Sequence, residues 1–75
     1  MKELLETIAK SLVDNPDAVN VNVVEKEDVI VLELHVGEGD MGKVIGRQGR
    51  IAKAIRTVMR AAATRNNVQI AVEID

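Results

Sequence analysis

All five glycines of this 75-residue chain lie between positions 37 and 49, in the segment GEGDMGKVIGRQG. Glycine adopts positive φ without steric cost and lets another molecule approach the backbone closely. This segment therefore marks where the chain turns sharply and where a ligand could touch its backbone. It contains three overlapping glycine patterns, and each pattern predicts a different kind of site.

Two of these patterns are typical of nucleotide binding. Residues 37–42 spell G-x-G-x-x-G, and the segment ending at Lys43 resembles a P-loop. A P-loop has Ser or Thr after its lysine, where this chain has Val44, and a dinucleotide site needs an acidic residue about 20 positions further on. Residues 41–65 contain no Asp or Glu. We therefore interpret the first glycines as turn residues, with Asp40 capping a short helix, MGKVI, through its side chain.

The spacing of apolar residues predicts the order helix, strand, strand, glycine-broken helix pair, strand. Recurrence at helical spacing indicates the helices, and two-residue alternation indicates the strands. The sequence Asn15-Pro16 ends the first helix, because proline cannot continue it. The predicted ranges are a helix over 4–13, strands over 19–23 and 29–36, a short helix over 41–45, a helix over 50–64 and a strand over 68–74.

Connection lengths then constrain the topology. The first two strands are close enough for an antiparallel hairpin, whereas the helical crossover makes the last strand parallel to the second. Each strand has a single apolar face, so the helices should cover one side of the sheet only. We expect an α+β two-layer sandwich with a three-stranded mixed sheet, folded as a single domain over residues 1–75.

Charge is strongly segregated along the chain. Segment 41–65 carries seven of the ten basic residues and no acid, whereas the rest holds all twelve acids and three Lys. The net charge of −2 therefore combines +7 in this segment with −9 elsewhere. A polyanion responds to the local field more than to net charge. The seven are Lys43, Arg47, Arg50, Lys53, Arg56, Arg60 and Arg65.

The helix predicted after Gly49 divides into two stripes. At about 100° per residue, Arg50, Lys53, Arg56 and Arg60 fall on one side. The roughly opposite stripe is apolar and is most simply core: Ile51, Ile55, Val58, Met59 and Ala62. A charged helix face is ordinarily explained by solvation alone. This one has no acid to balance it, and it begins at a helix N-terminus, where free N–H groups attract anions.

The turn Gly46-Arg47-Gln48-Gly49 adds a physical use for these charges. Its two glycines let the backbone approach a phosphodiester, and the two residues between them can reach phosphate oxygens. A glycine-terminated helix followed by a tight turn would explain one glycine, but not the surrounding cations.

At this point the sequence resembles a known family. The segment GKVIGRQGRIAKAI is similar to the signature of the KH RNA-binding domain, an aliphatic pair followed by G-x-x-G and an amphipathic helix. The predicted order, α-β-β-α-α-β, resembles the type II arrangement. The whole chain resembles the small stand-alone bacterial KH proteins of the KhpA type. One departure is Ala52, which stands where the pattern usually has a larger aliphatic residue.

The resemblance implies that a narrow groove holds about four nucleotides of single-stranded RNA. The G-x-x-G residues would clamp the backbone. Val44, Ile45 and the following helix would form one wall, with the last strand on the other side. The implied RNA-binding residues are Lys43, Val44, Ile45, Gly46, Arg47, Gln48, Gly49, Arg50, Lys53 and Arg56.

The family is also associated with global RNA-binding or RNA-chaperone roles, often beside a second KH-containing protein. A homodimer or a heteromer is therefore expected. An alternative function is a protein-interaction or dimerisation module, with RNA binding left to a partner. Its docking surface would be the uncovered side of the sheet, where we expect four apolar residues to face outward: Val24, Val29, Val31 and Ala71.

Other classes of function have little support in the sequence. The chain has no Cys, and its single His35 lies beside Glu33 on a wet strand face, so we expect no enzyme, metal site or cofactor. No apolar run is long enough for a signal peptide or a membrane span, which together with the lack of Cys predicts a cytoplasmic protein. Because no aromatic residue can stack on bases, we expect modest affinity and loose sequence preference.

Overall fold

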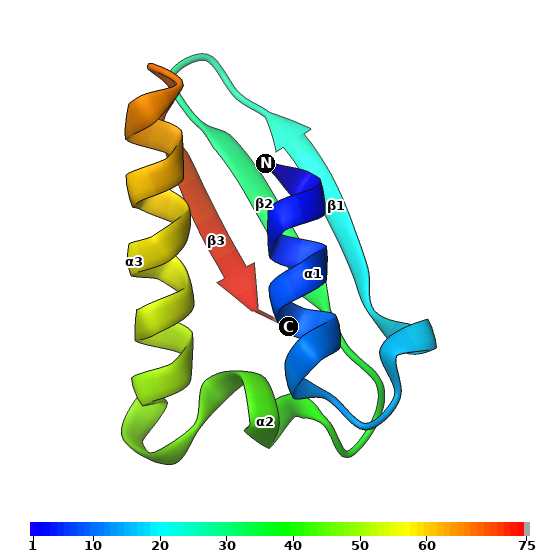
Figure 1. Ribbon diagram of the computed structural model, residues 1–75. Coiled ribbons are helices and arrows are strands. Elements are labelled where there is room, and N and C mark those ends of the chain that lie inside the picture. The colour runs from blue at the N-terminus through cyan, green and yellow to red at the C-terminus, as the bar shows by residue number, and fades with distance from the viewer. Residues whose placement is uncertain (75) are drawn as a thin grey trace.

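The computed structural model describes residues 1–74 and confirms the predicted α+β architecture. Three strands form one sheet in the order β1-β2-β3, and the long helices lie over one face of it (Figure 1). The elements in chain order are α1 (Lys2–Leu12), η1 (Pro16–Ala18), β1 (Asn20–Glu25), β2 (Ile30–His35), α2 (Met41–Ile45), η2 (Arg47–Gly49), α3 (Arg50–Arg65) and β3 (Ile70–Ile74).

The sheet is mixed, as predicted. Strands β1 and β2 form an antiparallel hairpin with Val21 opposite Leu34. Strand β3 runs parallel to β2 with Val72 opposite Leu32, after the helical crossover. Strand β2 is therefore central, whereas β1 and β3 each have one edge without a strand neighbour.

Helix α1 ends several residues before Pro16, the residue that was expected to stop it. The helix stops at Leu12, and Val13 is already extended at φ −95° and ψ 161°. Pro16 begins the short 3₁₀ helix η1, which delays the start of β1 until Asn20. The residue before a proline avoids the helical region, so the chain leaves α1 before it reaches this turn.

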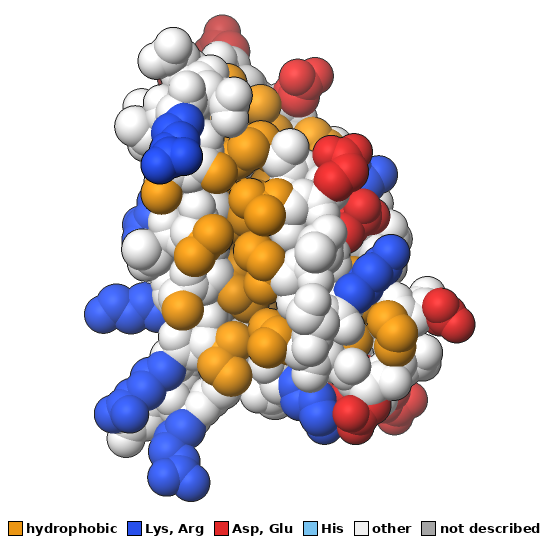
Figure 2. Space-filling model, viewed as in Figure 1, with side chains coloured by type: hydrophobic (Ala, Val, Ile, Leu, Met, Phe, Trp, Pro, Cys, Tyr) orange, Lys and Arg blue, Asp and Glu red, His pale blue; other side chains and the backbone are white. Residues whose placement is uncertain are grey.

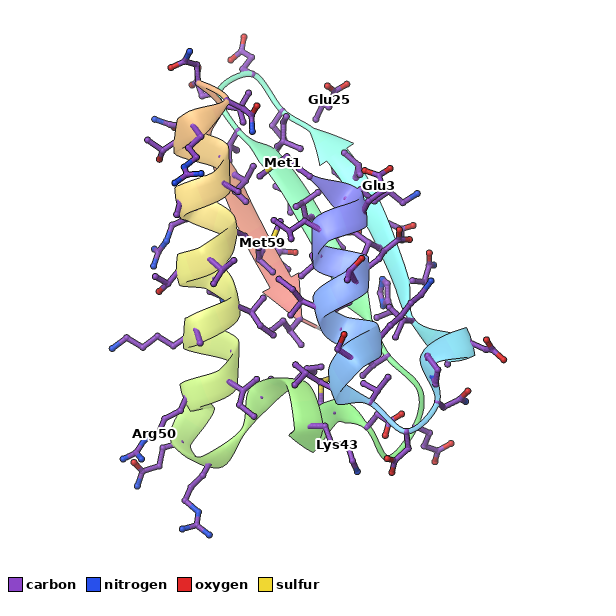
Figure 3. All side chains as sticks on the ribbon, in the orientation of Figure 1. Met1, Glu3, Glu25, Lys43, Arg50 and Met59 are labelled. Atoms are coloured by element: carbon purple, nitrogen blue, oxygen red, sulfur yellow. The ribbon has the colours of Figure 1, made fainter. Side chains whose placement is uncertain are left out.

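The core lies between the sheet and the helices and is aliphatic. Met59 of α3 points into it between α1 and the sheet (Figure 3). Burial of these side chains is the main force that holds the two layers together. The cluster of buried residues contains Leu5, Ala9, Val19, Val21, Leu32, Leu34, Val44, Ile55, Met59, Ala63, Ile70 and Val72.

One of the four apolar residues predicted to be exposed on the uncovered sheet face is buried. Val31 was expected to face outward as part of a docking patch, but only 5% of its surface is exposed. It lies on the central strand, directly between Val24 of β1 and Ala71 of β3 in the sheet register. These neighbours cover it from both sides. Val24 keeps 38% of its surface exposed, Ala71 is also exposed, and Val29 is half-buried.

Part of the apolar stripe on each long helix lies outside the core. We predicted a core position for Val58 of α3, and Leu4 and Leu12 belong to the apolar face of α1. All three are exposed, with Val58 retaining 48% of its surface. A two-layer fold buries only the helix sides that face the sheet and each other. The apolar stripes are wider than that contact requires.

Asp40 is the one charged residue among residues 1–74 that is buried, with 4% of its surface exposed. Its carboxylate accepts hydrogen bonds from the backbone N–H of Asp14 at 3.2 Å and of Asn15 at 3.0 Å. The predicted cap on α2 is wrong, since Asp40 makes no side-chain bond to that helix. Asp40 has φ −101° and ψ −5°, whereas a capping residue is typically extended. Its side chain instead fastens the segment after α1.

Replacing Asp40 with Ala should lower the free energy of unfolding by about 2 kcal/mol, because two backbone N–H groups lose their acceptor. Urea unfolding followed by circular dichroism measures the change. The exposed Asp17 on the neighbouring turn provides the control, and Asp17→Ala should cost less than about 0.5 kcal/mol. Equal losses for the two variants would contradict the structural role given to Asp40.

Candidate nucleic-acid interface

The G-x-x-G turn contains three residues at positive φ. Gly46 has φ 77°, Gln48 has φ 58° and Gly49 has φ 74°. The N–H of Gly49 donates to the carbonyl of Gly46 at 3.1 Å and closes the turn. The two glycines were predicted to supply the unusual dihedral angles, but the left-handed Gln48 was not foreseen. The tight turn directs the chain from α2 into α3.

The two glycines are required for different reasons. A Cβ on Gly46 would lie 2.6 Å from Cγ1 of Ile51, so no larger side chain fits there. A Cβ on Gly49 would meet nothing within 4 Å. Gly46 therefore allows close contact inside the protein, whereas Gly49 has open space beside its Cα at the start of α3.

The aliphatic residues around the turn are placed differently from the expected groove wall. Val44 has no exposed surface and lies in the core, so its side chain supports the turn from below and does not line a groove. Ile45 is half-buried. Ala52 faces the core, and Ile51 lies against Gly46, which accounts for the shifted aliphatic position in the sequence.

Most of the cations in this region have no acidic partner. Lys43 is the exception: its Nζ lies 3.1 Å from Oδ2 of Asp14 and 3.9 Å from Oδ1 of Asp40. Figure 3 shows Lys43 and Arg50 on opposite sides of the α2–α3 segment. The other predicted basic site residues form no ion pair with a carboxylate of residues 1–74: Arg47, Arg50, Lys53 and Arg56.

The unpaired cations give the molecule a basic side. Figure 2 shows Lys and Arg side chains along α3 and around the turn that precedes it, while acidic side chains gather over the opposite half. Arg47, Arg50 and Lys53 are exposed. Their charges therefore add to one another, and no carboxylate of residues 1–74 forms an ion pair with them.

A groove runs between α3 and the outer edge of β3. Arg56 is half-buried in it and donates from Nε to the carbonyl of Val72 at 3.2 Å. A hollow of about 230 Å³ lies here, and a second of about 250 Å³ continues it toward the end of α3. Arg60 and Ile70 line both hollows. Sequence reasoning left Arg60 out of the site, although its spacing of four from Arg56 puts both on one face.

The sheet face opposite the helices holds no metal centre within residues 1–74. Glu33, His35 and Glu73 line a shallow hollow there, with Glu33 opposite Glu73 in the register. No group of three or more potential ligands could hold an ion among the described residues. In the same part of the chain, no helix is long and apolar enough to cross a bilayer.

The order of elements, the mixed sheet and the G-x-x-G turn between two helices define a type II KH domain. The family model described as "KhpA/KhpB, KH domain" matches residues 2–74. The chain therefore belongs to the KhpA/KhpB family of KH domains.

Relatives from several bacteria are similar over almost their entire length. The RNA-binding protein KhpA of Clostridium acetobutylicum is 66% identical over 74 residues, covering 99% of each chain. That of Caldanaerobacter subterraneus is 58% identical with the same coverage. These relatives are named for RNA binding and not for a catalytic activity.

A solved structure shares the fold. Era from Aquifex aeolicus superposes with a TM-score of 0.72 at 21% sequence identity. The match covers 97% of this chain and 28% of the Era chain. At this identity the comparison describes the fold alone.

The two glycines of the turn should respond differently to Ala. Gly46→Ala combines strained backbone with a clash against Ile51, so the unfolding free energy should fall by about 3 kcal/mol. Gly49→Ala meets open space and should cost about 1 kcal/mol, from its left-handed backbone alone. Thermal unfolding followed by circular dichroism measures both. A larger loss for Gly49→Ala would contradict this assignment.

Proposed function

We propose that this protein binds single-stranded RNA, with the KH domain of residues 1–75 as the binding unit. The observation that carries the proposal is a run of unpaired cations that begins at a turn with an open glycine. The space beside the Cα of Gly49 is open, and Arg47, Arg50 and Lys53 are exposed around it. The names of the relatives support RNA as the ligand.

Phosphate oxygens are held at the start of α3. The N-terminus of a helix has free N–H groups and a positive dipole end, and both favour an anion. Arg47 and Arg50 add formal charge on either side of Gly49. Lys43 contributes less than the sequence predicted, because Asp14 and Asp40 already neutralise its ammonium.

The bound segment is short, about four nucleotides, as in other KH grooves. The backbone contacts are independent of sequence, and no aromatic residue is available for stacking. Affinity is therefore modest, and many RNAs are accepted. These properties suit a global RNA-binding or RNA-chaperone factor in the cytoplasm.

A charge-reversed turn tests the proposal. Arg47→Asp combined with Gln48→Asp should weaken RNA binding at least tenfold, because two carboxylates would face phosphates. Asp tolerates the left-handed backbone of position 48, so the turn should keep its shape. Fluorescence anisotropy with a labelled single-stranded RNA measures the affinity.

The matched control makes the same change of charge on the exposed side of α1. Thr7→Asp combined with Lys10→Asp should leave RNA binding within twofold of the unaltered protein, because both residues are exposed on α1 and lie outside the basic segment 41–65. If both double variants lose binding equally, net charge rather than the G-x-x-G turn governs the affinity, and the proposed site is wrong.

A second function, association with another KH domain, is favoured by an apolar groove between α1 and α3. The groove has a volume of about 500 Å³, and Figure 2 shows hydrophobic side chains exposed along it. This surface replaces the sheet patch as the candidate docking face, since Val31 is buried. Its lining residues are Leu4, Ile8, Leu12, Arg50, Ile51, Ala54, Ile55 and Val58.

A charge placed in this groove tests the second function. Val58→Asp should reduce the mass of the purified protein to that of a monomer in light scattering, because an unpaired carboxylate would be buried by association. Val24→Asp on the sheet face is the control and should leave the mass unchanged. If only Val24→Asp dissociated the protein, the docking face would be the sheet and not the groove.

A further inference from the structure

We propose that Arg56, which lies in the hollow between α3 and the outer edge of β3, selects guanine as the base bound there. The inference rests on the proposed RNA binding and concerns the base next to the clamp, whereas the turn itself holds phosphate. The hollow of about 230 Å³ is lined by Arg56, Arg60, Ile70, Ala71 and Val72.

The guanidinium of Arg56 is held in place by a hydrogen bond to the last strand. Its Nε donates to the carbonyl of Val72 at 3.2 Å, which holds the group against the edge of β3. Lys53 and Arg60 on the same stripe are exposed, whereas Arg56 is half-buried. Within residues 1–74 this is the one interaction of its side chain, and no carboxylate occupies the rest of the guanidinium.

Most of the N–H donors of Arg56 remain free to bind a ligand. A guanidinium has five N–H donors, and the bond to Val72 uses the one on Nε. The two terminal nitrogens still present a pair of parallel donors. Guanine offers a matching pair of acceptors, O6 and N7. Adenine has an amino group in place of O6, so one donor would face another donor.

The surface around the guanidinium is partly apolar. Ile70, Ala71 and Val72 form an apolar wall, and Arg60 lies on the opposite side of the hollow. No aromatic residue lines this hollow, so a flat base would lie against the strand edge without stacking on an aromatic ring. Apolar contact with this wall does not distinguish one base from another. The paired donors of Arg56 therefore provide the selection of guanine.

The distance along α3 connects this pocket to the clamp. Arg56 lies seven residues after Gly49, which corresponds to about 10 Å along the helix. A strand whose phosphate is held at the turn can therefore place a neighbouring base in the hollow. Phosphate contact and base reading then belong to one continuous groove.

A purely structural role for Arg56 makes a different prediction. If the bond to Val72 only fastens α3 to β3, then replacing Arg56 should lower stability and weaken all RNAs equally. If Arg56 reads guanine, the ratio of affinities between guanine and adenine probes should change. This ratio is independent of the overall affinity and separates the two roles.

The experiment uses short oligouridine probes that carry a single central guanine, adenine, inosine or 7-deazaguanine, with anisotropy as the readout. The unaltered protein should prefer guanine over adenine roughly five- to tenfold, as one bidentate contact provides. Inosine should bind like guanine, because it keeps O6 and N7. The 7-deaza probe should bind like adenine, because it lacks N7.

Arg56→Lys keeps the charge and removes the paired donors, so the ratio of guanine to adenine affinity should fall to about one. Arg60→Lys is the matched control and should keep the preference. A 7-deaza probe that binds as tightly as guanine overturns the inference, even without any variant. Binding of oligouridine with no guanine preference overturns this inference alone. No binding to any probe overturns the proposed function as well.

Discussion

The buried carboxylate of Asp40 ties together two segments that are far apart in the sequence. It accepts from the backbone of Asp14 and Asn15 and therefore joins the end of α1 to the start of α2. A buried charge is tolerated only where such partners compensate for lost hydration. With α2 anchored in this way, Val44 is held in the core and Gly46 against Ile51. The geometry of the G-x-x-G turn depends on this junction.

Helix α3 contributes side chains to two different surfaces. Its basic side runs along the groove with β3, and its apolar side meets α1 and remains partly exposed at Val58. Arg50 is shared, because it follows the turn and also lines the apolar groove. The proposed RNA binding and the proposed association with another KH domain would therefore use different sides of the same helix. The two proposed functions are compatible in one molecule.

Local patterns in the sequence predicted the order of elements, the mixed sheet and the turn, because periodicity and glycine position are properties of neighbouring residues. The errors arose where a residue depends on distant partners. Asp40 contacts residues more than twenty positions away, and Val31 is buried by neighbours set by strand register. Lys43 was counted as a free cation, since its pairing with Asp14 follows only from the tertiary contact.

The contact between Arg56 and Val72 affects how easily another molecule can add a strand to the sheet. Strand β3 is at an edge, and an uncovered edge is a template onto which a strand of another molecule can add. Arg56 occupies one of its carbonyl groups and places a charged side chain across the edge. A second copy that added there would have to displace this arginine. The side chain therefore guards the sheet against edge-to-edge aggregation while the groove is empty.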